Sequence, residues 1–277
     1  MHRKLPLLFF IVFLIGLCVT VVLRLTLVRS FIDPSSGFYR GAYAAPALTL
    51  NVVTGVCAVL LLVPLALPGK AVVLAPLRAR DPLLGMLAAL SALVLLADAL
   101  SLFASLVTTS TSGGLFLDAL FTLAAAFYFG LQAKIFLLGG EAPHAFVALL
   151  PVLWATVHLI VSWMHFTVVT SLPDNLFDLF KMGAFMLLFY YHARLAGGVP
   201  NGREGRGLLS FGLLAVWLGA LSAVPLLLVR LGGGQTAAFS LPDSAVTLVL
   251  SVYILVLFVR LFFRRGPVEA ATVRSAA

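Results

Sequence analysis

The sequence predicts an all-α, polytopic integral membrane protein, built as a bundle of about eight transmembrane helices. Composition is the first observation: of 277 residues, 62% are hydrophobic and only 10% are charged, whereas a soluble domain is about 25% charged. The second is a mean hydropathy of +1.14, and the third is that long apolar stretches fill the chain almost end to end. No soluble core buries this much apolar surface, so the surrounding medium must be lipid.

Eight stretches are each long enough to cross a hydrocarbon layer of about 30 Å at about 1.5 Å per residue. In chain order they are 5–28, 47–67, 83–107, 115–139, 146–169, 177–197, 208–230 and 244–264. Turn-forming residues such as Gly139-Gly140 separate them. The loops are short, so consecutive helices should be antiparallel neighbours in one transmembrane domain spanning residues 1–277. Residues 265–277 form a short cytoplasmic tail.

Lys and Arg residues predict the orientation, because they gather on the cytoplasmic side of membrane proteins. With the N-terminus inside, most of them fall on that side, and both termini are predicted to be cytoplasmic in a multi-pass protein of the cell membrane. The first outer segment is the exception, since it carries Arg24, Arg29 and Arg40 against Asp33. Cleavage of the first stretch as a signal peptide is the alternative. Its only A-x-A-like site, 42–44, lies far beyond the apolar run, which favours retention.

The formal net charge of +8 does not indicate a nucleic-acid partner, because the cations stand at the ends of the stretches rather than on one patch. They are better explained as orientation signals and as contacts to anionic headgroups, so the lipid bilayer is the first expected partner. Cys18 and Cys57 lie inside apolar stretches and are expected to pack as small apolar residues. Two thiols form neither a disulfide framework nor, alone, a zinc site.

Asp98 is an ionisable residue inside the third predicted span. Such a side chain costs about 2.5–3.5 kcal/mol to insert, so it requires a partner, water or a function. Ser91, Ser101 and Ser105 share its helix face. The four residues are expected either to line a polar cavity, in which Asp98 binds a cation or relays a proton, or to form a serine-rich packing face.

The fifth stretch carries Trp154, His158 and His165 on one face, at steps of four and seven residues. The two imidazoles lie about 10 Å apart along such a helix, too far for one small metal ion to bind both, and no metal site is predicted. A proton relay is the functional alternative, because histidine titrates near neutral pH. A histidine hydrogen-bonded to a neighbouring helix is the structural alternative.

The sixth stretch opens with Asp178 and Lys181, which are three residues apart and can form an ion pair. One interpretation is an interfacial pair with Lys181 extended toward water, and the other makes Lys181 a fixed cation for an anionic ligand. His192 follows on the same helix face, near the cytoplasmic end. Asp118, near the outer end of the fourth stretch, is interpreted as a boundary residue first and a site residue second.

These ionisable side chains have a similar predicted depth in the membrane. With the N-terminus inside, six ionisable residues from four consecutive helices fall between mid-membrane and the outer surface. They are Asp98, Asp118, His158, His165, Asp178 and Lys181. If the helices converge, these residues form a cavity that is open to the outside and binds a ligand or relays protons. The outer segment from Phe31 to Pro46 is predicted either as a lid over this cavity or as an aromatic belt with a turn.

Known catalytic patterns are absent: the chain has no P-loop, no H-E-x-x-H and no G-x-S-x-G sequence. No cofactor is expected, and three classes of function remain. The embedded polar residues favour a small-solute transporter or permease-like protein, although no internal repeat supports it. A membrane sensor or accessory subunit with a protein partner is the second class. A lipid-directed intramembrane enzyme, using histidine and aspartate as acid and base, is the third and has the least support.

Overall fold

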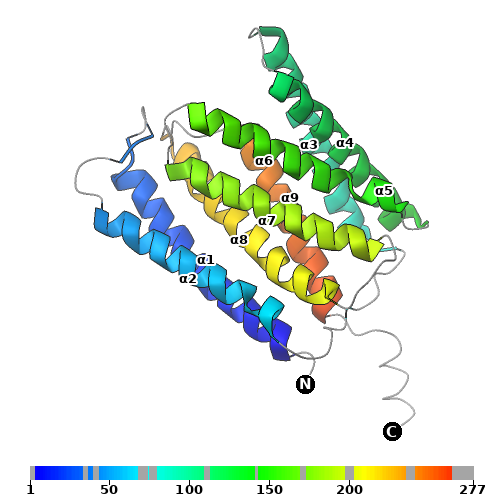
Figure 1. The fold of residues 1–277 in the computed structure, drawn as a ribbon, viewed down its shortest axis with the longest axis horizontal. Helices are drawn as coiled ribbons and strands as arrows, with labels where there is room; N and C mark the ends of the chain where they lie inside the picture. Colours follow the sequence, from blue (N-terminus) through cyan, green and yellow to red (C-terminus); the bar gives the residue numbers. More distant parts are fainter. Residues whose placement is uncertain are drawn as a thin grey trace.

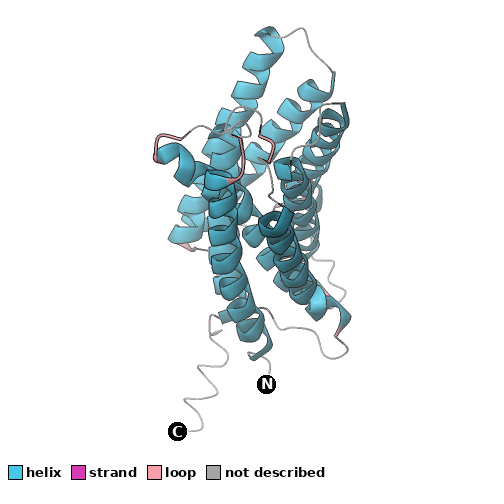
Figure 2. Ribbon diagram, turned by 90° about the vertical axis from the view of Figure 1, so that its left-hand side faces the viewer, coloured by secondary structure: helices cyan, strands magenta, loops and turns pink. Residues whose placement is uncertain are grey.

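The computed structural model describes residues 4–33, 37–39, 44–67, 74, 80–108, 113–140, 143–168, 173–196, 203–234 and 241–263. These residues form helices almost throughout (Figure 2), and no strand occurs among them. The helices are α1 (Lys4–Ser30), α2 (Ala44–Ala66), α3 (Pro82–Thr108), α4 (Gly113–Leu138), α5 (Ala145–Ala148), α6 (Leu150–Val168), α7 (Pro173–Ala196), α8 (Glu204–Leu231) and α9 (Leu241–Phe263).

The architecture confirms the predicted fold class. Seven segments are long and apolar enough to cross a membrane, and they correspond to α1 to α4, to α5 together with most of α6, and to α8 and α9. The remaining long helix, α7, is not among them, because its apolar run is interrupted by Asp178, Lys181, His192 and Arg194. Whether α7 crosses the bilayer therefore remains a prediction.

Every predicted stretch lies on a helix, and the ends differ by no more than about one helical turn. Two differences have identifiable causes. The fifth stretch is broken at Leu149, where the backbone turns through a 3.2 Å hydrogen bond to the carbonyl of Phe146, just before Pro151 removes an N–H from the helix. The eighth stretch begins earlier than predicted, and this places Asp243 inside the first turn of α9.

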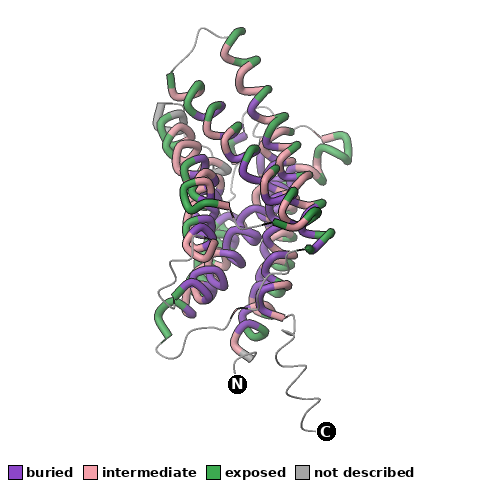
Figure 3. Tube along the Cα trace, turned by 90° about the vertical axis from the view of Figure 1, so that its right-hand side faces the viewer, coloured by how far each residue is buried: buried purple, intermediate pink, exposed green. Residues whose placement is uncertain are grey.

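Helix α8 is the centre of the bundle. It packs against α1, α2, α7 and α9 and is the most buried of the candidate spans. The indole of Trp217, fully buried on α8, donates a 2.9 Å hydrogen bond to the hydroxyl of Thr20 on α1. Figure 3 shows the buried residues gathered in the interior of the bundle and the exposed residues on its periphery.

The outer helices flank this centre as two pairs. The α1–α2 pair packs on α8, whereas the α3–α4 pair packs on α9 and α6. Figure 1 shows α1 and α2 on the opposite side of the bundle from α3 and α4, whose ends stand clear of the other helices. The polar residues described below lie between these two pairs, where α6, α7 and α9 meet.

The two ends of the bundle are named here from α1. The proximal end holds the start of α1 and the end of α9, where the ring of Phe10 lies 5.9 Å from that of Phe258. The ion pairs at this end include Arg194 to Glu204 at 3.3 Å and Arg260 to Asp81 at 3.1 Å. The distal end is the opposite one, where α1, α3, α6 and α8 finish and α4, α7 and α9 begin.

Candidate functional site

Five of the six predicted site residues come together in the distal half of the bundle. Together with Asp243 they form what we call the distal cluster: Asp98 on α3, Asp118 on α4, His158 on α6, Asp178 and Lys181 on α7, and Asp243 on α9. His165 also lies on α6, but its side chain is outside the described residues. The predicted cavity assumes that these helices converge. The five residues that can be placed do lie close together.

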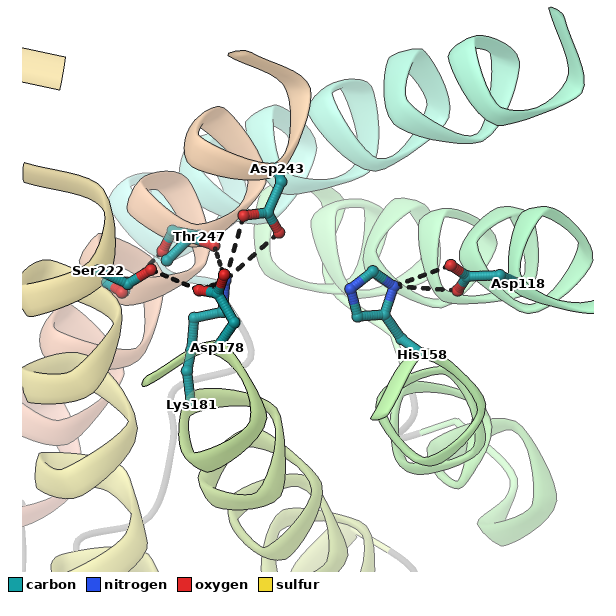
Figure 4. Close-up of polar contacts among 8 residues, drawn as sticks. Asp118, His158, Asp178, Lys181, Ser222, Asp243 and Thr247 are labelled. Atoms are coloured by element: carbon teal, nitrogen blue, oxygen red, sulfur yellow. Dashed lines mark hydrogen bonds and ion pairs between the residues drawn. The ribbon is translucent and has the colours of Figure 1, made fainter. Parts of the chain in front are cut away.

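Lys181 is the centre of one half of the cluster (Figure 4). Its ammonium group lies 3.2 Å from an oxygen of Asp178, one turn earlier on α7. It also lies 3.2 Å from a carboxylate oxygen of Asp243 and 3.2 Å from the hydroxyl of Thr247, both on α9. The hydroxyl of Ser222 on α8 donates a 2.6 Å hydrogen bond to Asp178. Lys181 and Asp178 together thus join three helices, α7, α8 and α9.

The position of Lys181 corrects one of the sequence interpretations. The pairing with Asp178 is present, but the lysine does not extend to the water: its side chain is only 1% exposed. An ammonium group without partners inside a membrane protein is costly, whereas two carboxylates and a hydroxyl satisfy its three N–H donors. The carboxylate of Asp243 supplies the attraction that turns the side chain inward.

Asp118 and His158 form the other half of the cluster. The Nδ1 atom of His158 lies 3.0 Å from both carboxylate oxygens of Asp118, which is buried. Asp118 lies near the start of α4, as expected of a residue near the end of its span, but its carboxylate is buried and paired rather than extended toward water. The ring of Trp154, one turn before His158 on α6, lies 6.3 Å from the imidazole, as expected for residues on one helix face.

The imidazole of His158 lies between the two halves. Figure 4 shows its Nδ1 directed at Asp118 and its other ring nitrogen directed toward the side where Lys181 and Asp243 lie. His158 interacts electrostatically with both of those residues. Within the described chain, the second ring nitrogen makes no hydrogen bond. It is therefore available to exchange a proton or to bind a polar ligand.

Asp98 is the one member of the cluster whose carboxylate makes no hydrogen bond to any of the described residues. It interacts electrostatically with His158, Asp243, Asp118 and Lys181. The serine face predicted around it does not converge on the carboxylate. The hydroxyls of Ser91 and Ser101 instead bond to backbone carbonyls of their own helix, as serines in membrane helices commonly do.

Arg24 brings α1 close to the same region. Its guanidinium stacks over the ring of Phe177 at 5.0 Å and interacts electrostatically with Asp178 and with Tyr39. Of the predicted lid, 37–39 and the start up to Asp33 are described; Ile32 and Tyr39 form an isolated antiparallel bridge there. The rest of the segment lies outside the described residues, so the lid stays a prediction.

Carboxylates outnumber cations in this site. Asp98, Asp118, Asp178 and Asp243 face one lysine and one imidazole, and counting Arg24 still leaves two more carboxylates than permanent cations. Unbalanced negative charge is expensive in the low dielectric of a membrane protein. The site therefore favours protons on its carboxylates and imidazole, a bound cation, or both.

The sequence interpretation did not include Asp243, Ser222 and Thr247. The predicted eighth stretch starts one residue after Asp243, which places this carboxylate outside the predicted helix. Two signals point to it in hindsight: Asp243 and Thr247 are four residues apart on one helix face, and an aspartate suits the positive N-terminal end of a helix. Ser222 carries no comparable signal, because serine is common in membrane helices.

A second polar group, the proximal triad, lies deeper in the bundle and consists of Tyr128, His192 and Tyr253. The hydroxyl of Tyr128 lies 3.2 Å from Nδ1 of His192 and accepts a 2.9 Å hydrogen bond from Gln132. All three side chains of the triad are buried. The sequence placed His192 on the face of Lys181, but its tyrosine partners come from α4 and α9 and were not foreseen.

Aromatic rings separate the two polar groups. Phe185 and Phe189 on α7 stack at 6.1 Å between the positions of Lys181 and His192. Phe129 on α4 and Trp154 on α6 close on Phe189 at 5.9 and 6.5 Å. Such a layer excludes water between the distal cluster and the proximal triad.

Among the described residues, no group of three or more His, Cys, Asp or Glu side chains is arranged to hold a metal ion. No protein-family model, curated protein or solved structure matches the chain.

Proposed function

We propose that the protein is a small-solute transporter of the cell membrane whose distal cluster faces the outside and binds the coupling proton or cation. The observation that carries this proposal is the excess of carboxylates around Lys181 and His158. A site of this composition gains stability from each positive charge it takes up and loses stability when the charge leaves. Uptake and release at such a site are what coupling to an ion gradient requires.

Partial exposure of the cluster supports access from the distal end. The side chains of Asp178, Asp243 and His158 remain 31%, 37% and 22% exposed, whereas the proximal triad is closed. The aromatic layer of Phe185, Phe189 and Phe129 separates these regions. An open polar site on one side of an apolar barrier is the arrangement expected of a transporter that faces one side of the membrane.

Proton and cation flux in proteoliposomes tests the proposal. The wild-type protein is reconstituted with a pH-sensitive dye inside, and a potassium diffusion potential, negative inside, drives cations inward. One arm supplies protons alone and the other adds sodium at constant pH with a sodium-sensitive dye. We expect flux above that of empty liposomes in one arm, and Asp118→Asn to reduce it by at least about tenfold, because the negative charge beside His158, which takes up a proton or cation, is lost.

Asp81→Asn is the matched control. Asp81 is another buried aspartate in an ion pair, with Arg260 at 3.1 Å, but it lies at the proximal end. Its substitution should leave the flux close to that of the wild-type protein. Equal losses in both variants would assign the effect to folding rather than to the cluster. Wild-type flux no higher than that of empty liposomes in both arms would contradict the proposal and favour an accessory subunit.

One observation favours the third class of function, a lipid-directed intramembrane enzyme. The Asp118–His158 pair at 3.0 Å is an arrangement that general acid–base catalysis uses, and a cavity of about 950 Å³ with mainly apolar lining lies between α2 and helices α6 to α8. However, no hydroxyl or thiol contacts the second nitrogen of His158 in the described chain. A lipid product that disappears from extracts with His158→Ala would favour this class over transport.

A further inference from the structure

A small cavity lies in the middle of the proximal triad. Its volume is about 10 Å³, and the residues around it include Tyr128, His192 and Tyr253 with Phe129, Leu188 and Phe189. A cavity that holds one water molecule has a volume of at least about 10–15 Å³. This cavity lies at the lower limit of that range and is too small for an organic solute.

The hydroxyl of Tyr253 supplies the second observation. The residue is only 1% exposed, and its hydroxyl oxygen has no hydrogen-bond partner among the described residues. A buried hydroxyl without a partner costs about 1–3 kcal/mol, so such groups nearly always bond to protein or to ordered water. Tyr253 also interacts electrostatically with Tyr128, which lies across the cavity.

We propose that one water molecule occupies this cavity and bridges the hydroxyl of Tyr253 to the Tyr128–His192 pair. A buried water typically makes about three hydrogen bonds to otherwise unsatisfied polar groups. Tyr253 provides the unsatisfied hydroxyl. The hydroxyl of Tyr128, already bonded to Gln132 and His192, and the imidazole of His192 provide the remaining partners. The result is a closed hydrogen-bonded network that joins α4, α7 and α9.

The same three helices also carry four residues of the distal cluster, Asp118, Asp178, Lys181 and Asp243. Asp118 and Tyr128 lie ten residues apart on α4, and Lys181 and His192 lie eleven apart on α7, which places the two sites about 15 Å from each other. The next step rests on the proposed function. The hydrated triad is then a second site at which a coupling proton binds, on the other side of the aromatic layer from the distal cluster, and we call it the second station. Only a proton fits this role, because the cavity holds no larger ion with its own hydration.

The sign of the effect of Tyr253→Phe tests for the water. The substitution removes only the hydroxyl and keeps the ring, which packs edge-on against Phe129 at 5.4 Å. If the hydroxyl bonds to a water, its loss raises the unfolding equilibrium constant in mixed micelles by about three- to fivefold. If the cavity is dry, removal of an unsatisfied hydroxyl leaves that constant unchanged or lowers it, which overturns the proposal.

A double-mutant cycle of Tyr128→Phe and Tyr253→Phe tests the bridge. The two hydroxyls make no direct hydrogen bond, so coupling between them has to pass through a shared partner. With the water in place, the double variant is less destabilised than the product of the single effects by about threefold. Tyr191→Phe with Tyr253→Phe is the control and is expected to be additive, because Tyr191 packs elsewhere, against Phe211.

The cycle also separates this inference from the proposed function. Non-additivity in the Tyr128–Tyr253 cycle without any wild-type flux establishes the water site and removes its role in transport. Additivity together with wild-type flux overturns the water site and leaves the distal cluster as the only station. When both are present, Tyr253→Phe should reduce proton flux while Tyr191→Phe does not, and equal flux in the two variants would overturn the second station.

Discussion

At the scale of single residues, Lys181 is the side chain on which the distal cluster most depends. It is buried and joins Asp178, Asp243 and Thr247. We expect Lys181→Met to leave two carboxylates facing each other without a cation. Removing one partner of a buried ion pair costs about 3–5 kcal/mol, and the partial exposure of both aspartates should bring the loss toward the lower limit. Unfolding in mixed micelles measures it.

Lys134→Met is the matched control for this prediction. Lys134 is an exposed lysine on α4, and the same substitution there should change the unfolding free energy by less than about 0.5 kcal/mol. Adding Asp243→Asn to Lys181→Met should recover part of the loss, because one unpaired carboxylate disappears. A Lys181→Met protein as stable as the wild type would show that the carboxylates are neutral or hydrated without the lysine.

At this scale, the sequence predicts which residues are costly but not which partners they find. Asp178 and Lys181 are neighbours on one helix, so local spacing was sufficient to pair them. The Asp118–His158 and Lys181–Asp243 contacts join helices that are far apart in the chain. They depend on the rotation of each helix about its axis, which the chain's nearly uniform apolar pattern leaves undetermined.

At the scale of the elements, the close approach of α8 and α9 holds the cluster in place. Gly219 on α8 permits it: a Cβ atom there would lie 2.5 Å from the hydroxyl of Ser251 and 3.2 Å from a methyl of Thr247. We expect Gly219→Ala to push α9 away from α8 and to displace Thr247, which contacts Lys181. Overpacking of this kind costs about 1–3 kcal/mol and should also lower flux.

Gly183→Ala is the control at the same scale. Gly183 lies inside α7, and an added Cβ atom there would meet nothing within 4 Å. The substitution should therefore not destabilise the protein, and the intrinsic helix preference of alanine favours it slightly. If both variants unfold at the same denaturant concentration as the wild type, α8 and α9 are less closely packed than Gly219 implies.

At the scale of the whole molecule, composition and apolar length were sufficient to predict the helical membrane bundle and to place the helix ends to within about one turn. Helix α7 shows where this reasoning reaches its limit. Its charges lower the mean hydropathy, so it does not qualify as a span by length and composition. In the folded bundle, however, Asp178 and Lys181 are paired with each other and with neighbouring helices. Pairing lowers the cost of insertion, which a count of charges ignores.

Whether α7 spans the bilayer can be determined from the sides of the membrane on which the two chain ends lie. An even number of crossings returns the chain to the side where it began, whereas seven crossings leave the last residue on the opposite side. We expect eight crossings with both termini inside, because the paired charges of α7 no longer oppose its insertion. In a background with Cys18→Ala and Cys57→Ala, single cysteines at Asp243 and at Ala277 report the two ends of α9.

An impermeant thiol reagent is applied to intact cells and, separately, to permeabilised cells. Asp243→Cys should react from outside, because this position lies at the accessible side of the distal cluster, where the aspartate side chain of the wild-type protein is 37% exposed. Ala277→Cys should react only after permeabilisation, as should a cysteine introduced before α1. Labelling of Ala277→Cys but not of the N-terminal cysteine in intact cells would mean seven crossings. In that case α7, with Lys181 and the cluster around it, would lie at the membrane surface rather than inside the bilayer.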